Sequence, residues 1–339
     1  MSPLNRRRLQ HFRASKRGMI SLVVFGTMFV LSLFAEILAN DRPILVRYDG
    51  GFYMPVFRDY PETTFGGDLP TNAVYVDPEV KKLIDEKGWM LWPLIPYRYD
   101  TIIAGDGRNS LLPPSLKHPL GTDDQARDVL SRVIYGFRIS VLFGFTLTVL
   151  SSIVGIAAGA VQGYFGGWVD LGFQRFLEVW SSLPTLYLLL ILASLIQPTF
   201  WILLGLLLLF SWTALVGFVR AEFLRGRNFD YVRAARALGM VDARIMMRHI
   251  LPNAMTAALT YLPFILAGSV TTLTSLDFLG YGLPPGSPSL GELLLQGKNN
   301  LNAPWLAFAG FIVISLMMAL LVFIGEAVRD ALNPRKVLT

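Results

Sequence analysis

Runs of roughly 20 predominantly apolar residues recur along the chain, and they limit its possible folds more than any other feature. A helix of about 20 apolar residues is long enough to cross the hydrocarbon core of a bilayer. The composition agrees, because 53% of the 339 residues are hydrophobic and only 16% are charged, whereas about a quarter are charged in a typical soluble domain. The sequence therefore predicts an all-α polytopic membrane protein.

Six such runs predict six transmembrane helices. The expected spans are residues 19–39, 139–163, 179–197, 199–219, 255–276 and 305–324. The second span is rich in Gly, Ala and Ser, which are small enough to let membrane helices approach closely. Pro184 is expected to kink the third span, and Gln197 and Pro198 are expected to form a tight turn after it. Residues 164–178 are predicted to be a short loop.

The charges that flank these spans predict their orientation. Residues 1–18 contain six Arg or Lys and no acid, and the loop at 220–253 is rich in Arg. Basic segments of this kind stay in the cytoplasm, so both termini and this loop are expected there. The first span has no clear cleavage site and is expected to remain as an anchor. Nucleic acid is not expected as a partner, because a basic flank before a membrane helix is much commoner than a nucleic-acid-binding arm.

The long segment between the first two spans has a different composition. Acidic and basic residues are mixed between residues 41 and 132, and turn-forming Pro and Gly are frequent. Its aromatic residues include Tyr48, Phe52, Tyr53, Phe57, Tyr60, Trp89, Trp92, Tyr97 and Tyr99. Such a composition favours a small ordered lobe over a free linker, with Pro78–Lys87 as its one expected helix. The aromatics are expected in a core or an interfacial belt more often than on a binding surface.

Residues 230–253 read DYVRAARALGMVDARIMMRHILPN and lie between two expected spans. Asp230 is a good helix N-cap, and Gly239 can adopt the left-handed conformation that ends a helix. Asp242 is expected to cap a second short helix, and Pro252 to mark the turn after it. The segment is therefore predicted to be a helix, a glycine break and a second helix at the membrane surface.

A second charged segment precedes the second span. Residues 118–138 read HPLGTDDQARDVLSRVIYGFR. On spacing alone Asp123, Asp124 and Asp128, with Arg127 between them, are candidates for a metal site. No His or Cys stands at a matching spacing, so a charged helix start that pairs with itself is the favoured interpretation. No metal is predicted.

The loop at 230–253 resembles the signature loop of ABC-importer permease subunits, in which an EAA motif is followed by G and then by I and LP. The matching residues are Ala234, Ala235, Gly239, Leu251 and Pro252. Arg233 stands where the signature has Glu, and His249 stands where it has Ile. In that family the loop forms a coupling helix that docks into a groove of the ATP-hydrolysing subunit. The coupling residues that the resemblance implies are Arg233, Ala234, Ala235, Gly239, Asp242, Leu251 and Pro252.

Two other stretches resemble the dipeptide and oligopeptide subfamily of these permeases. Residues 118–138 resemble a segment that comes just before the second span in that subfamily. The motif residues there are Gly121, Thr122, Asp123, Asp124, Arg127 and Asp128. Residues 277–294, DFLGYGLPPGSPSLGELL, resemble a stretch that partly re-enters the permease core near its outer gate. The resemblance covers the chain from His118 onward.

The resemblance implies the six-helix fold of ABC type I importer permeases with an extracytoplasmic lobe. The expected parts are a basic cytoplasmic N-terminus at 1–18, transmembrane helix 1 at 19–39, a periplasmic lobe at 40–137, a permease core at 138–327 with coupling loop 220–253, and a cytoplasmic C-terminus at 328–339. The implied partners are a homologous permease subunit that completes a heterodimer, cytoplasmic ABC ATPase subunits, a periplasmic peptide-binding protein and the lipid of the bacterial inner membrane. The implied cargo is oligopeptides or peptide-like compounds. ATP and magnesium would bind to the ATPase partners, so the chain itself is expected to be non-catalytic and to hold no cofactor.

Two other functional classes are open. An ion-coupled secondary transporter usually keeps ionisable residues in the middle of the membrane, but the centres of expected spans two to six hold none. A membrane-anchored enzyme or scaffold would place its activity in the lobe. The sequence contains no phosphate-binding loop, HExxH motif or nucleophile elbow, and it has no cysteine. Both alternatives are therefore disfavoured.

Overall fold

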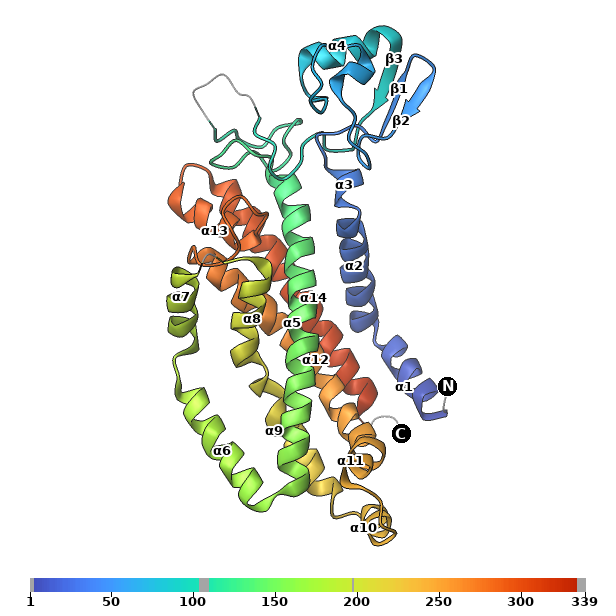
Figure 1. Ribbon diagram of the computed structural model, residues 1–339, viewed down its shortest axis with the longest axis vertical. Helices are drawn as coiled ribbons and strands as arrows, with labels where there is room; N and C mark the ends of the chain where they lie inside the picture. The colour runs from blue at the N-terminus through green and yellow to red at the C-terminus, as the bar shows by residue number, and fades with distance from the viewer. Residues whose placement is uncertain (1–2, 104–109, 197, 334–339) are drawn as a thin grey trace. The chain divides into compact units, whose positions relative to one another are not determined.

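The computed structural model describes residues 3–103, 110–196 and 198–333, which divide into two compact units. Unit 1 contains residues 1–26, 141–284 and 315–339, and unit 2 contains residues 27–140 and 285–314. Helices α2 (Lys16–Leu33), α5 (Val129–Phe165) and α14 (Pro304–Leu332) contribute residues to both units (Figure 1).

Four single helices among the described residues are long and apolar enough to cross a membrane, and two bent helix pairs meet the same criterion. The single helices are Lys16–Leu33, Val129–Phe165, Asp242–Phe278 and Pro304–Leu332. The pairs are α6 with α7 (Gly167–Ser182 and Thr185–Leu195), bent by 70°, and α8 with α9 (Phe200–Ser211 and Thr213–Gly226), bent by 40°. The predicted all-α polytopic fold is confirmed, and the predicted six spans hold if each bent pair is one span.

The third predicted span differs most from the structure. The loop predicted at 164–178 is wrong, because Gly167–Ser182 forms helix α6. The charge of Asp170 within α6 is compensated, because its carboxylate accepts hydrogen bonds from Arg220 of α9, with Nε–Oδ1 at 2.5 Å and Nη2–Oδ2 at 2.7 Å. The kink at Pro184 is confirmed, since α7 begins at the next residue. The predicted turn at Gln197 lies outside the described residues.

Three glycines of α5 bring this helix against the backbone of α9 in unit 1. A Cβ atom at Gly155, Gly159 or Gly163 would lie 2.4, 2.7 or 2.5 Å from the carbonyl oxygen of Trp212, Val216 or Arg220, respectively. The glycines are spaced by four residues and therefore share one face of α5. The close approach expected from the small residues of this span is confirmed.

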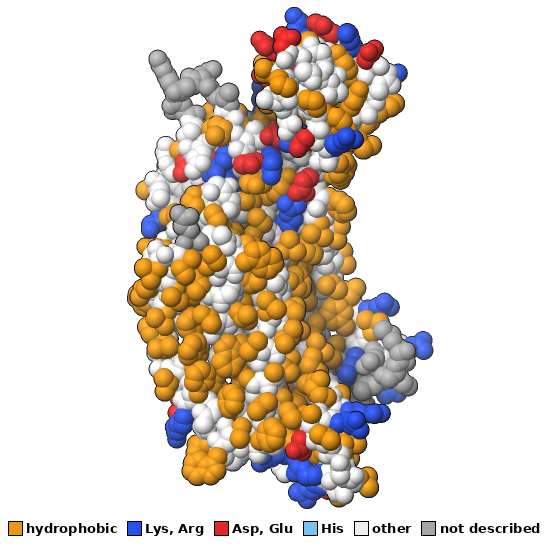
Figure 2. Space-filling view, viewed as in Figure 1, with side chains coloured by type: hydrophobic (Ala, Val, Ile, Leu, Met, Phe, Trp, Pro, Cys, Tyr) orange, Lys and Arg blue, Asp and Glu red, His pale blue; other side chains and the backbone are white. Residues whose placement is uncertain are grey.

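Large hydrophobic side chains remain exposed on the membrane helices of unit 1. Examples are Phe176, Val179, Tyr187, Ile191 and Trp201. Hydrophobic side chains cover most of the visible face of α6, α7 and α8 (Figure 2). Such a surface fits helices that border lipid or another membrane subunit.

The basic N-terminal segment, for which no helix was predicted, forms α1 (Pro3–Ala14).

The outer part of unit 2 is a small lobe with a three-stranded antiparallel sheet. The strands are β1 (Leu45–Tyr48), β2 (Gly51–Tyr53) and β3 (Gly88–Leu91), in the order β2-β1-β3. A short 3-10 helix η1 (Glu62–Phe65) and α4 (Pro78–Lys87) lie between β2 and β3 in the chain. Helix α4 has the predicted bounds, and Asp77 caps it by accepting a hydrogen bond from the backbone N–H of Glu79 at 2.9 Å. The strands were not predicted, because they are too short to show an alternating pattern.

Aromatic rings fill the core of this lobe. Phe65 is fully buried, and its ring centroid lies 5.3 to 6.4 Å from the rings of Tyr48, Tyr53, Tyr60 and Tyr75 in edge-on arrangements. Edge-on aromatic pairs add to the hydrophobic stabilisation. Many of the aromatics of this segment therefore form a core.

The remaining part of unit 2 contains α3, the start of α5, α13 and the start of α14. Helix α3 (Ala35–Leu38) packs with Ile95 and Tyr135, and the Tyr135 hydroxyl donates a hydrogen bond to the carbonyl of Ala39 at 2.9 Å. Helix α13 (Leu290–Asn299) packs closely on α14, since a Cβ at Gly297 would lie 2.5 Å from the backbone nitrogen of Ala307.

The glycine contact generates a prediction about stability. Gly159→Ala places a methyl group against the backbone of α9, and we expect it to lower the free energy of unfolding by about 1–3 kcal/mol. The matched control is Gly217→Ala in α9, because a Cβ there meets no described atom within 4 Å. Thermal unfolding of the purified subunit in detergent measures both. Equal stability of the two variants would contradict the contact.

Candidate functional site

Two short helices follow α9 in the chain and belong to unit 1. They are α10 (Asp230–Ala237) and α11 (Asp242–Ile245) (Figure 1). Gly239 lies between them with φ of +77°, and its N–H donates to the carbonyl of Arg236 while the N–H of Met240 donates to that of Ala235. This pair of bonds is the glycine helix stop known as the Schellman motif. The predicted helix, glycine break and helix are confirmed.

The predicted caps of these helices are wrong. Asp230 and Asp242 are the first residues of α10 and α11, and the cap positions are held by Phe229 and Val241, whose side chains form no cap hydrogen bond. The helices begin one residue earlier than a capping aspartate requires. Both carboxylates still lie at the positive end of a helix dipole, which stabilises them.

The predicted end of the second helix at Pro252 is also wrong. Residues 242–278 form one continuous helix, in which α11 passes through the π-helical turn η2 (Met246–Ile250) into α12 (Leu251–Phe278). The N–H of Leu251 donates to the carbonyl of Met246, five residues back. In a regular α-helix the proline ring would collide with the carbonyl four residues back. The wider π-helical turn lets the chain accept Pro252 without stopping.

One face of α10 and α11 is buried in unit 1. Val232 and Ile245 are fully buried and Ala235 nearly so, and they pack in a cluster that includes Tyr164 of α5 and Phe223 of α9. Leu251 packs against the same cluster. The two short helices are therefore held on the membrane helices by hydrophobic contacts.

The opposite face of α10 and α11 is exposed and combines apolar and basic side chains. Leu238 is 86% exposed, Val241 67% and Met247 66%. We call this face the loop surface, and its exposed members are Arg233, Ala234, Arg236, Leu238, Val241, Arg244, Met247 and Arg248. The side chain of Arg233 forms no ion pair or hydrogen bond with any described residue. Pro252 is also exposed.

Tyr164 at the end of α5 holds both short helices. Its hydroxyl donates a hydrogen bond to Asp242, and the Arg236 guanidinium lies 5.3 Å from the centre of its ring. Arg227 donates to the carbonyl of Tyr164 at 3.3 Å. No signal in the sequence linked Tyr164 to the loop, because Asp242 is 78 residues away. Of the coupling residues implied by the resemblance, Ala235, Asp242 and Leu251 position the loop, while Arg233 and Ala234 face outward.

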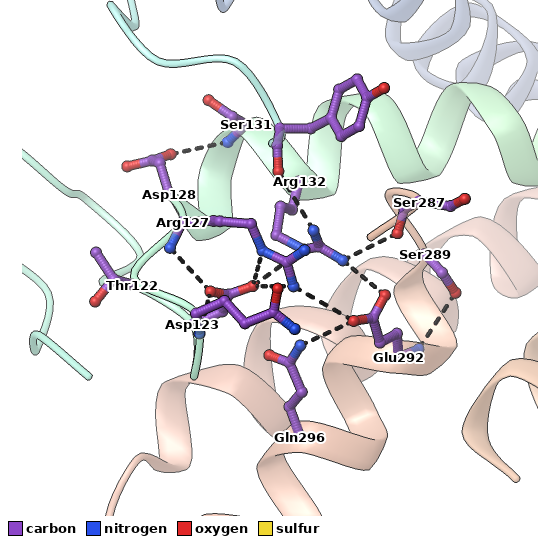
Figure 3. A network of polar contacts seen from close by, with 12 residues as sticks. Thr122, Asp123, Arg127, Asp128, Ser131, Arg132, Ser287, Ser289, Glu292 and Gln296 are labelled. Carbon is purple, nitrogen blue, oxygen red and sulfur yellow. Dashed lines mark hydrogen bonds and ion pairs between the residues drawn. The ribbon is translucent and has the colours of Figure 1, made fainter. Parts of the chain in front are cut away.

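In unit 2 the motif residues at 121–128 form the start of a buried ion network (Figure 3). Asp123 is fully buried and accepts hydrogen bonds from the backbone N–H groups of Gln125 and Arg127, both at 2.9 Å, and from Nε of Arg127 at 2.7 Å. The self-paired arrangement expected from the sequence is therefore present. Asp124 is exposed.

Hydrogen bonds of Asp128 and Thr122 fix the two ends of the same motif. Asp128 caps α5 by accepting from the N–H of Ser131 at 2.9 Å, and His118 contacts its other oxygen at 2.9 Å. The Thr122 hydroxyl donates to the carbonyl of Ser110, and Trp305 of α14 donates to the carbonyl of Thr122 at 3.1 Å. Gly121 has φ of +73°, a conformation that favours glycine.

Glu292 of α13 completes the network. Its carboxylate pairs with Arg132 at 2.7 Å and with Arg127 at 3.4 Å, and Gln296 donates to it at 3.0 Å. The side chains of Arg127 and Arg132 are 3% and 0% exposed. Arg132 also donates to the carbonyl of Ser287 at 3.0 Å. Two buried cations therefore face two acids, and the pairing joins α5 to α13 within unit 2 (Figure 3).

Arg132 and Glu292 were missed in the sequence because they are 160 residues apart. Each belongs to a stretch that resembles the peptide subfamily, but nothing in the sequence indicated that the two stretches meet. Among the described residues no group of three or more His, Cys, Asp and Glu is placed to hold a metal ion. The buried acids of the motif, Asp123 and Asp128, are engaged by Arg127, Arg132 and His118 instead.

The network generates a second prediction about stability. Glu292→Gln removes one of two acids facing two buried guanidinium groups, and we expect it to lower the free energy of unfolding by about 3–5 kcal/mol. The control is Glu178→Gln, which breaks a pair with Arg175 whose side chains are 58% and 70% exposed and should cost less than about 1 kcal/mol. Thermal unfolding of the purified subunit measures both. A Glu292→Gln variant as stable as the control would show that the network is not stabilising.

Comparison with known proteins agrees with the resemblance seen in the sequence. Residues 151–337 match the family described as binding-protein-dependent transport system inner membrane component. The chain is 56% identical over 336 residues to the inner membrane ABC transporter permease protein YejE of Escherichia coli, with 99% of this chain and 98% of the relative covered. It is 55% identical over 359 residues to the peptidoglycan transport system permease protein YejE of Agrobacterium fabrum, with 99% and 94% covered.

A third relative is named for an oligopeptide transport system. The chain is 35% identical over 231 residues to the oligopeptide transport system permease protein OppC of Lactococcus lactis, with 67% of this chain and 78% of the relative covered. Because the family match covers more than half of the chain and two relatives match it over nearly their full length, the chain belongs to the binding-protein-dependent inner membrane components, the permease subunits of ABC transport systems.

Proposed function

We propose that this permease forms half of a channel that imports oligopeptides or peptide-like compounds, and that ATPase subunits drive it by binding the loop surface. The observation that carries the proposal is the two-sided character of α10 and α11. Val232, Ala235 and Ile245 hold them on the membrane helices, while Leu238 and Val241 are exposed among arginines. Exposed apolar side chains rimmed by polar ones are typical of protein interaction sites.

The continuous helix at 242–278 gives the partner a mechanical connection to the membrane. A displacement of α11 moves α12 directly, since no loop separates them. Helices α9 and α12 in turn border a cavity of about 330 Å³ in unit 1. Its lining residues are Ser211, Ala214, Phe218, Tyr261, Phe264, Ile265, Gly268, Ser269 and Thr272. We propose that this cavity belongs to the translocation path.

The cavity lining suits a peptide. Phe218 and Tyr261 stack with ring centroids 3.8 Å apart, and Ser269 and Thr272 add hydroxyl groups. Apolar walls with a few polar groups are typical of sites for small organic ligands. None of the lining residues in the described part of the chain is charged. The names of two of the relatives refer to peptidoglycan and oligopeptide transport, so peptides and peptide-bearing fragments are the proposed cargo.

The proposed assembly follows the family. A homologous permease subunit completes the channel as a heterodimer, and a binding protein delivers the cargo from the outside. We infer that both termini and the loop at 220–253 lie in the cytoplasm of a bacterial cell, which their basic residues favour. ATP and magnesium bind to the ATPase partners and not to this chain.

Gly239→Val tests the role of the loop. Valine at φ of +77° is strained by roughly 1–3 kcal/mol, so we expect α11 to be re-aimed, with loss of transport-coupled ATP hydrolysis in the reconstituted importer and normal membrane insertion. The control is Gly239→Asn, because asparagine tolerates left-handed backbone and should keep most of the activity. Normal transport by the valine variant would show that the loop is not the coupling element.

The solvent face of the lobe sheet is proposed as the docking surface for the binding protein. The strand register places Arg47 beside both Phe52 and Trp89, which are 65% and 43% exposed. The Arg47 guanidinium lies 5.8 Å from the centre of the Phe52 ring. Trp and Arg are enriched among the residues that contribute most to protein interfaces. The competing role is anchoring of the lobe at the membrane interface, where Trp is also enriched.

The variant Phe52→Ser/Trp89→Ser separates these two roles. Docking predicts that the binding protein stimulates ATP hydrolysis with about 30-fold weaker affinity, since residues at the centre of an interface are often worth about 2 kcal/mol. Basal hydrolysis and assembly should be unchanged. The control is Leu69→Ser/Val74→Ser, which removes two exposed apolar residues outside the strands. Unchanged stimulation by the first variant contradicts docking on this face, and a parallel loss of basal hydrolysis indicates a structural or anchoring role.

A further inference from the structure

We propose that unit 1 holds a binding site for the phosphate group of an anionic phospholipid. The site is a cavity of about 510 Å³ bordered by α1, α9, α10, α12 and α14. Its basic lining residues are Arg8, Arg225 and Arg329. It is separate from the proposed translocation cavity, with which it shares no lining residue.

Two of the cationic groups that line the cavity pair with no acid among the described residues. Arg225 pairs with Glu222, the one acid among the lining residues, at 2.6 Å. The side chains of Arg8 and Arg329 form no ion pair or hydrogen bond with any described residue. They come from opposite ends of the sequence and face the same cavity. Two guanidinium groups that face one cavity repel each other, and a shared anion reverses this cost. Guanidinium groups bind phosphate oxygens in pairs of hydrogen bonds.

The rest of the lining suits a phosphate diester that carries apolar chains. Asn253 lies at the cavity with its amide donating to the Tyr231 hydroxyl at 3.3 Å, and Thr256 adds a hydroxyl group. The apolar wall consists of Phe229, Ile250, Ala254, Ala257 and Leu332. Basic pockets between membrane helices are known sites for anionic lipid headgroups. A water-soluble phosphate has no apolar chain that could pack against this wall.

The position of the cavity in the chain favours a lipid over a soluble anion. Ala254 and Ala257 belong to the helix Asp242–Phe278, which is apolar enough to cross a membrane. Gly18 of α2 packs directly on α14, since a Cβ there would lie 2.2 Å from Cβ of Ala327. This contact brings α1, which precedes the apolar helix α2, beside α14.

The site is tested on the full chain in nanodiscs of phosphatidylcholine that contain increasing fractions of phosphatidylglycerol. Native mass spectrometry counts the phosphatidylglycerol molecules retained, and the midpoint of the titration gives the affinity. In Arg8→Ala/Arg329→Ala we expect about 30-fold weaker retention, because the charge-assisted hydrogen bonds of two guanidinium groups to the phosphate are lost. The matched control is Arg6→Ala/Arg7→Ala, which removes two exposed cations of α1 that do not line the cavity. We expect it to change retention by less than about threefold, since only diffuse attraction is lost.

The outcomes decide between the lipid site and its alternatives. Equal loss in both double variants means diffuse attraction to a basic surface and overturns the proposal. If millimolar glycerol phosphate displaces all of the retained phosphatidylglycerol, the cavity is a site for free phosphate, and the proposal of a lipid site is overturned. Retention that is unchanged in Arg8→Ala/Arg329→Ala, with weaker binding of the ATPase subunits, assigns the two arginines to a protein partner and also overturns it.

Folding of the variants is checked in the same discs. Wild type and both double variants should unfold at the same temperature in phosphatidylcholine alone. Phosphatidylglycerol should raise the unfolding temperature of wild type and of Arg6→Ala/Arg7→Ala, because a ligand of the native state stabilises it. The same rise in Arg8→Ala/Arg329→Ala would contradict the site even if that variant is otherwise intact.

Discussion

The packing of α5 on α9 is the contact on which the rest of unit 1 depends. Gly155, Gly159 and Gly163 allow the two backbones to touch. Tyr164, the next residue of α5, then lies beside the end of α9, where Arg227 donates to its carbonyl. From there it bonds Asp242 and contacts Arg236. The position of α10 and α11 is therefore set by a helix contact inside the membrane region and not by the loop sequence alone. A side chain larger than hydrogen along this stripe would separate the helices and move the support of the loop.

Local backbone chemistry could be read from the sequence, and contacts between distant residues could not. The stop at Gly239, the kink at Pro184 and the helix Pro78–Lys87 each depend on a few adjacent residues, and all three are present in the structure. Pro252 follows the same local rule, yet the helix continues through it. The rule failed there because a π-helical turn supplied the extra space, and such a turn leaves no mark in the sequence pattern. The strands of the lobe were missed because three or four residues show no period.

The same difference between local sequence and distant contacts applies to the residues of the candidate sites. The signature match located the loop at 230–253 for which we propose a coupling role, because the family resemblance depends on residues close together in the chain. It could not identify Tyr164, Arg132 or Glu292, whose roles come from contacts across 78 and 160 residues. Arg132 carried a second difficulty. A fully buried arginine is improbable until its acids are known, since an unpaired buried charge is costly, and Glu292 lies on a helix that the sequence did not pair with α5.

Charge compensation differs between the ion network around Glu292 and the loop surface. In the network around Glu292 every buried cation faces an acid, so the start of α5 and α13 need no other component to be stable. The loop surface differs, because Arg233 has no counter-charge among the described residues and lies beside exposed Leu238. An uncompensated cation in water costs little, and it gains when an acidic surface approaches. The signature Glu would bring a negative charge to this position, so the proposed docking of an ATPase subunit on the loop surface predicts an acidic side chain opposite Arg233. The ATPase subunit of this importer is therefore expected to differ from those of Glu-bearing permeases at that one contact, and a charge-reversing pair of substitutions across the contact, with activity restored only in the double variant, would establish it.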